Sequence, residues 1–151
     1  MFLAQQGYRV VAVDQSSRGL DKAQALAAGR GVKIESVVAD LADYRIAAES
    51  WDGIVSIWCH LPRPLCARVH RNVVAGLRAG GVFLLEAYTP RQLRFGTGGP
   101  RKADVLATLA ELRGELEGLD LVYAEERERE LYEGHTHSGR SAVVEIVAVK
   151  R

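Results

Sequence analysis

The chain has 151 residues, of which 48% are hydrophobic and 26% are charged, and 20 Lys and Arg against 19 Asp and Glu leave a net charge of +1. This length fits a single domain over residues 1–151, and the charge gives no electrostatic reason to expect nucleic acid or an anionic membrane as a partner. No apolar run approaches the ~20 residues that cross a bilayer, no signal peptide is visible, and two cysteines suit a reducing compartment, so we expect a cytoplasmic protein.

Strands and helices alternate through most of the sequence. Residues 1–6 have the composition of the end of a helix closed by Gly7, and apolar runs that stop at polar residues follow them. Ser16 or Ser17 can cap the helix that comes after the first visible strand. The predicted strands cover residues 8–13, 32–39, 52–58 and 82–88, and the predicted helices cover residues 18–28, 64–78 and 103–116.

The last third of the chain has a different pattern. Residues 89–101 hold three glycines and two prolines, which predicts a long loop. Residues 119–134 and 140–150 predict two strands joined by a polar turn, and so a C-terminal antiparallel hairpin. The alternation ahead of the hairpin predicts an α/β fold with a doubly wound, mostly parallel, Rossmann-like sheet.

In such sheets a ligand lies outside the carboxyl ends of the strands, and this rule selects Asp14 with Gln15 and Asp40 with Leu41. A carboxylate after the first visible strand can accept two hydrogen bonds from a ribose diol, which makes Asp14 the best ligand candidate. The alternative for Asp14 is a helix cap or an Asx-turn, because DQSS precedes a helix. Asp40 can accept from an adenine amino group while Leu41 packs on the ring, or it is a simple turn residue.

The same rule selects residues at the ends of the next two strands. His60 follows the strand that ends at Trp58 and has a side chain suited to proton transfer, so it is the candidate general base; a histidine hydrogen-bonded to a neighbouring loop is the alternative. The candidate substrate contacts at the end of the following strand are Tyr88, Thr89, Arg91 and Gln92.

A metal site is not expected from the histidine and cysteine spacing. His135 and His137 in the polar turn form a conceivable set with Cys59 and His60, but their spacing fits no structural zinc pattern. A solvated hairpin tip is the simpler interpretation, and Cys59 has no visible base that would make it a nucleophile.

The order of these motifs resembles class I S-adenosylmethionine-dependent methyltransferases from their second strand onward. The resemblance rests on GYRVVAVDQS, VVADL, WDGIVSIWCHLP and LRAGGVFLLEAYTP, with Ala79 in place of the family's usual proline. The terminal hairpin matches the reversed last strand of that superfamily. SIWCHLP, EAYTPRQL and GTGGP resemble the tellurite-resistance (TehB-like) group, whose members act on small molecules.

The resemblance implies S-adenosylmethionine as the cofactor. It implies that Asp14 binds the ribose, that Asp40 and Leu41 hold the adenine, and that Ile57 and Trp58 line the floor near the methionine part. The family's first strand and glycine-rich loop have no counterpart ahead of Met1. We therefore expect a sheet without its first strand, impaired methyl transfer, and a homodimer as one way to replace the strand.

Two other functions stay open at this point. A nicotinamide-dependent oxidoreductase also places an acid after its second strand, although the terminal hairpin argues against it. A non-catalytic oligomerisation or binding module could keep the scaffold without the glycine-rich loop.

Overall fold

The structure is a computed structural model that describes residues 1–134 and 137–151. The described chain divides into two compact units, Met1–Arg45 and Ile46–Arg151, and each is treated by itself. The single domain over residues 1–151 stays a prediction. Among the described residues, none of the helices combines the length and the apolar character needed to span a bilayer.

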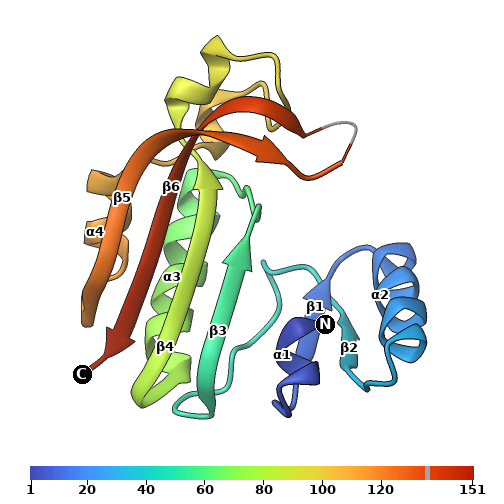
Figure 1. Ribbon diagram of the computed structural model, residues 1–151. Helices are drawn as coiled ribbons and strands as arrows, with labels where there is room; N and C mark the ends of the chain where they lie inside the picture. The colour runs from blue at the N-terminus through green and yellow to red at the C-terminus, as the bar shows by residue number, and fades with distance from the viewer. Residues whose placement is uncertain (135–136) are drawn as a thin grey trace. The chain divides into compact units, whose positions relative to one another are not determined.

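Met1–Arg45 is a small α/β unit built around a parallel pair of strands (Figure 1). Its elements in chain order are α1 (Phe2–Gln5), β1 (Val11–Asp14), α2 (Ser17–Gly29) and β2 (Glu35–Val38). The register runs from Val11 opposite Glu35 to Asp14 opposite Val38. Both strands are shorter than predicted because pairing begins only at Val11 and Glu35, although the apolar runs begin earlier.

Helix α2 begins where the sequence predicts. The Ser16 side chain accepts a hydrogen bond from the Gly19 amide at 3.0 Å, which satisfies one of the free amide groups of the first turn. Leu20 and Ala27 of α2 are buried, as is Ile34 just before β2. These three side chains are the apolar centre of the unit.

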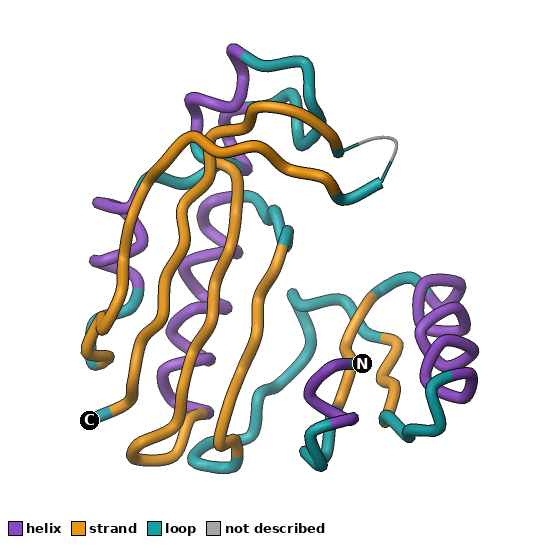
Figure 2. The backbone as a smooth tube through the Cα atoms, in the orientation of Figure 1, coloured by secondary structure: helices purple, strands orange, loops and turns teal. Residues whose placement is uncertain are grey.

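Ile46–Arg151 contains the larger sheet, whose strand order is β3-β4-β6-β5 (Figure 2). Strands β3 and β4 are parallel, whereas β6 runs antiparallel to both β4 and β5. The elements of this unit are β3 (Trp51–Ile57), α3 (Arg63–Gly76), β4 (Leu77–Tyr88), η1 (Pro90–Arg94), η2 (Ala103–Val105), α4 (Leu109–Glu115), β5 (Leu119–Tyr132) and β6 (Ser138–Lys150).

The core of this unit lies between the sheet and helices α3 and α4, which cover the same face of it (Figure 1). Phe83 and Leu85 of β4 point into this core, because alternate residues of a strand face the same side. The remaining fully buried members of the cluster are Val73, Leu77, Ala107, Leu112, Leu116, Leu119, Val144, Ile146 and Ala148.

The predicted end of the helix over residues 64–78 is wrong. Helix α3 ends at Gly76, and β4 begins directly at Leu77. Leu77 pairs with Trp51 and Val82 pairs with Gly53, so the strand carries extra residues in a bulge. Gly80, with φ +77°, supplies the left-handed backbone that this bulge requires.

The predicted helix over residues 103–116 is wrong in its first half and confirmed in its second half. Its first part forms only the short turn η2, and α4 starts after Thr108. The Thr108 side chain accepts from the Glu111 amide while the Glu111 carboxylate accepts from the Thr108 amide, and this capping box fixes the helix start. The loop over residues 89–101 also contains the turn η1.

The predicted fold class is confirmed. The structure is α/β, its strands include two parallel pairs, and β5 and β6 form the C-terminal antiparallel hairpin. Within residues 1–134 and 137–151 the strands lie in two sheets rather than in one continuous sheet.

Candidate functional site

Two carboxylate residues, Asp14 and Asp40, lie at the carboxyl ends of β1 and β2. Asp14 is the last residue of β1 and lies opposite Val38 at the end of β2. The Ala39 amide donates to the Asp14 carbonyl at 3.0 Å, and Asp40 follows immediately. The structure therefore brings Asp14 and Asp40 to one edge of their sheet, as the sequence predicts.

Each of these carboxylates uses only one oxygen in holding the backbone. Oδ1 of Asp14 accepts from the Ser16 amide at 2.8 Å, and Oδ1 of Asp40 accepts from the Ala42 amide at 2.8 Å. Both side chains are exposed, and in the described part of the chain neither Oδ2 atom has a hydrogen-bond partner. Both residues form Asx-turns, and each turn leaves one acceptor oxygen of the carboxylate facing solvent. The roles of Asp14 and Asp40 in binding a nucleoside stay predictions.

The residues that follow these two acids, Gln15 and Leu41, are also predicted to contact the cofactor. Gln15 is exposed beyond the end of β1, and Leu41 is half-buried after Asp40. These residue types can bind a nucleoside, because the acids accept from hydroxyl or amino groups and an apolar side chain packs against a ring.

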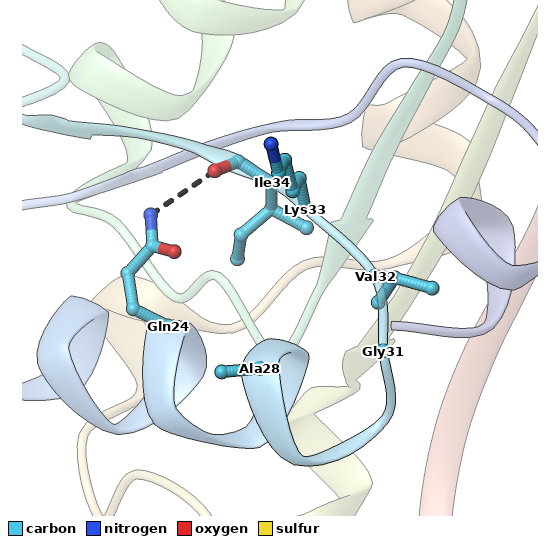
Figure 3. Close-up of a pocket in the computed structure, with 6 residues that line it drawn as sticks. All are labelled: Gln24, Ala28, Gly31, Val32, Lys33 and Ile34. Carbon is cyan, nitrogen blue, oxygen red and sulfur yellow. Dashed lines mark hydrogen bonds between the residues drawn. The ribbon is translucent and has the colours of Figure 1, made fainter.

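The same unit also has a hollow of about 470 Å³, which is not lined by Asp14 or Asp40 (Figure 3). Gln24 reaches across it to donate to the Ile34 carbonyl at 3.1 Å and to Ser36 Oγ at 2.7 Å. Its lining residues are Gln24, Ala28, Gly31, Val32, Lys33 and Ile34. These residues precede β2, so the hollow is at the amino end of that strand, whereas a ligand of an α/β sheet binds at the carboxyl ends.

An aromatic stack closes the carboxyl ends of β3 and β4. The Trp58 and Tyr88 rings stack with centroids 4.5 Å apart, and the His60 ring stacks on Tyr88 at 5.5 Å. Trp58 has φ +56°, a conformation that a bulky residue adopts only when its surroundings hold it. Its Nε1 donates to Glu133 Oε2 at 2.6 Å, which ties the end of β3 to the terminal hairpin.

Both ring nitrogens of His60 are engaged by backbone groups. The Tyr88 amide donates to Nε2 at 3.1 Å, so Nδ1 carries the proton and donates to the Trp58 carbonyl at 3.1 Å. Burial lowers the pKa of His60, which keeps the ring neutral. This geometry is the one expected of a histidine that holds a loop, and the role of His60 as general base stays a prediction.

Three of the four predicted substrate residues are buried. Tyr88, Thr89 and Gln92 are each 1% exposed, whereas Arg91 is exposed and pairs with Glu128 at 2.5 Å. Substrate contact by these four residues stays a prediction.

Gln92 has a clear structural task that the sequence did not reveal. Its Oε1 accepts from the Ala142 amide at 2.8 Å, and its Nε2 donates to the Gly98 carbonyl at 3.0 Å and to Thr97 Oγ1 at 3.1 Å. Gln92 therefore fastens the loop after η1 to β6.

Other predicted residues lie near this end of the sheet. Ile57 is 53% exposed at the end of β3. Cys59 is half-buried, and of the conceivable metal set His135 lies outside the described residues. Sequence reasoning missed Glu133, and no signal could have found it, because it is 75 residues from its partner Trp58.

Comparisons with known proteins give one family and one fold. A family described as "Methyltransferase domain" matches residues 1–81, which is more than half of the chain. A search of curated proteins finds no match.

Solved structures similar to this chain share its fold at low sequence identity. TehB from Haemophilus influenzae has a TM-score of 0.79 at 18% identity, over 99% of this chain and 52% of that one. A SAM-dependent methyltransferase from Methanosarcina mazei has a TM-score of 0.74 at 20% identity, over 98% of this chain and 84% of that one. The N-methyltransferase NodS from Bradyrhizobium japonicum, in complex with S-adenosylhomocysteine, has a TM-score of 0.69 at 16% identity, over 94% of this chain and 66% of that one. The chain thus spans about half the length of TehB.

Proposed function

The chain belongs to the methyltransferase domain family, and from this premise we propose that it binds S-adenosylmethionine and serves methyl transfer to a small molecule. S-adenosylmethionine is the methyl donor that goes with this family and fold, and its sulfonium group supplies the methyl that a nucleophile takes up. The single observation that supports the proposal most is the pair of free carboxylate oxygens at the ends of β1 and β2.

The residues of the first unit suit the nucleoside half of the cofactor. The free Oδ2 of Asp14 is the acceptor for the ribose hydroxyls, with exposed Gln15 beside it. The free Oδ2 of Asp40 is the acceptor for the adenine amino group, and Leu41 packs on the ring. The Asx-turns hold both carboxylates before a ligand arrives, so little conformational freedom is lost on binding.

For the reacting half of the cofactor, the resemblance to the family implies Ile57 and Trp58. Ile57 offers an exposed apolar surface at the end of β3, and the stacked Trp58 is fixed by Glu133. A rigid apolar floor positions a methyl group for transfer, and proximity and orientation are the main contributions that a protein makes to such a reaction. Arg91 is the most accessible of the predicted substrate contacts.

A small-molecule acceptor fits the likeness in fold to TehB, and the cytoplasm is the proposed location. A homodimer fits the edges of the sheets, because among the described residues β1 pairs only with β2 and β3 pairs only with β4. Sedimentation equilibrium at several concentrations measures whether the chain is a dimer.

Calorimetry with S-adenosylmethionine, S-adenosylhomocysteine and NAD tests the proposed cofactor. We expect the two adenosyl-sulfur ligands to bind and NAD not to bind. Asp14→Asn should weaken S-adenosylhomocysteine roughly 10- to 100-fold, because it removes the charge from one hydrogen-bonding acceptor. Asparagine still accepts from the Ser16 amide, so the turn is kept.

Asp21→Asn is the matched control, since it makes the same charge change at an exposed position of α2. It should leave binding unchanged. Binding of NAD in place of the adenosyl-sulfur ligands would favour the oxidoreductase, and binding of none of the three would favour a non-catalytic binding module.

A further inference from the structure

A buried cluster of three metal-ligand side chains lies between α3 and α4 in the second unit. Cys66 and His70 are four residues apart on α3, so they lie on one face of that helix, and Glu115 is the last residue of α4. Cys66 is 7% and His70 is 4% exposed, and the Glu115 side chain is 13% exposed. His70 also packs edge-on against Phe83 of the core, at a centroid distance of 6.0 Å.

The donor atoms of these side chains are close together. The sulfur, nitrogen and oxygen donors all lie within 4.8 Å of one another. Sγ of Cys66 is 3.9 Å from Nδ1 and 3.8 Å from Nε2 of His70, so the ring offers a lone pair near the sulfur in either neutral tautomer. Nδ1 of His70 is 2.6 Å from Oε2 of Glu115.

We propose that Cys66, His70 and Glu115 bind one Zn²⁺ ion that joins α3 to α4. In a tetrahedral zinc site neighbouring ligand atoms are about 3.3 to 3.6 Å apart, so the sulfur must approach the ring slightly. The zinc ion replaces the hydrogen bond between His70 and Glu115, because Nδ1 binds the metal only after its proton has moved to Nε2. A thiolate ligand favours Zn²⁺ over Mg²⁺ or Ca²⁺, which prefer oxygen.

The charges around the cluster are compatible with this ion. Zinc binding displaces the Cys66 thiol proton to solvent, and the thiolate and the Glu115 carboxylate together neutralise the two positive charges of the metal. Arg63 pairs with Glu115 and lies 3.9 Å from Glu111, so a second carboxylate balances the guanidinium.

Four-coordination needs a fourth ligand, which we assign to water. Nη1 of Arg63 is fully buried and has no hydrogen-bond partner in the described part of the chain. A water molecule bound to the zinc would accept a hydrogen bond from that nitrogen and complete four-coordination.

Titration of the full chain with Zn²⁺ and Co²⁺ after removal of metal by a chelator tests this site. We expect one Zn²⁺ per chain, a raised Tm, and a Co²⁺ complex with a thiolate-to-cobalt charge-transfer band and the strong visible bands of four-coordination. Cys66→Ser and His70→Gln should each weaken Zn²⁺ by at least about 100-fold, because loss of a mere supporting residue already costs 10- to 100-fold. Circular dichroism checks that each variant is folded.

Cys59→Ser is the matched control, because it removes the other cysteine of the chain. It should keep the stoichiometry, the affinity and the cobalt spectrum. Equal zinc affinity in the wild type and Cys66→Ser would overturn the proposal. If Cys66→Ser does not fold, a wild-type cobalt complex without the thiolate band overturns it instead. Neither result would bear on cofactor binding at Asp14, which the calorimetry measures separately.

Discussion

The two units use the ends of their parallel strands in opposite ways. At the ends of β1 and β2, Asp14 and Asp40 are exposed, and each keeps one carboxylate oxygen without a partner among the described residues. At the ends of β3 and β4, Trp58, His60 and Tyr88 stack on one another, and both nitrogens of the histidine are engaged. Residues at the carboxyl ends of the parallel strands therefore offer free acceptor atoms in the first unit, whereas in the second unit they are held by contacts with one another.

The units also differ in how much apolar surface they bury. In the first unit Leu20, Ala27 and Ile34 are the buried apolar residues among those described. In the second unit the core extends over four strands and two helices of the described chain, with Phe83 at 0% exposure. A substitution should therefore cost most at the buried positions of the second unit, and four predictions test this expectation.

Phe83→Ala should lower the free energy of unfolding more than any other substitution considered. It removes a fully buried ring and leaves a cavity against α3, which typically costs about 3 to 5 kcal/mol. Urea unfolding followed by circular dichroism measures the loss. Val122→Ala is the control, because Val122 is 70% exposed on β5 and its truncation should cost less than about 0.5 kcal/mol. Equal costs would mean that the second unit has no tightly packed core.

Gln92→Leu in the second unit and Gln15→Leu in the first unit are the same substitution at a buried and at an exposed position. Gln92→Leu leaves the buried Ala142 amide without its acceptor and the Gly98 carbonyl without its donor, at about 2 to 4 kcal/mol together. Gln15 is exposed, so its replacement should change the free energy of unfolding by less than about 0.5 kcal/mol. A similar loss in both variants would contradict the burial of Gln92.

Gly99→Ala compared with Gly31→Ala separates backbone strain from crowding. Both glycines have positive φ, at +83° and +68°, so alanine strains either backbone by about 1 kcal/mol. At Gly99 the new Cβ would also lie 2.6 Å from Cδ2 of buried Tyr88, whereas at Gly31 it meets nothing within 4 Å. The loss at Gly99 should reach about 2 to 3 kcal/mol. Thermal and urea unfolding measure both, and equal losses would exclude close packing on Tyr88.

The smallest expected effect is the pH dependence of stability that His60 causes. It concerns the second unit, because all four histidines follow residue 45. Burial lowers the pKa of His60 in the folded protein, so below about pH 6.5 the unfolded chain binds the proton more readily. Stability should fall as the pH drops through this range and level off above it.

The measurement for His60 is the Tm of the wild type and of His60→Gln between about pH 7.5 and pH 5.5. The wild type should lose more Tm on acidification than the variant, and the difference isolates His60 from the other histidines. An identical loss in both proteins would show that His60 is not buried in its neutral form.

The sequence alone determined the features that depend on neighbours along the chain. The alternation of strands and helices, the Ser16 cap, the position of Asp14 and Asp40 at strand ends, and the terminal hairpin follow from local periodicity and capping chemistry. These interactions form within a few residues, so their pattern is visible in the order of side chains.

Only the tertiary structure decided which side chains meet across long separations. The end of α3 at Gly76 depends on the pairing of Leu77 with Trp51, and the tautomer of His60 depends on the Tyr88 amide. Trp58 and Glu133 are 75 residues apart, and His70 and Glu115 are 45 apart. Packing of the sheet against its helices selects such partners, because a buried polar group must find whichever donor or acceptor the fold brings to it.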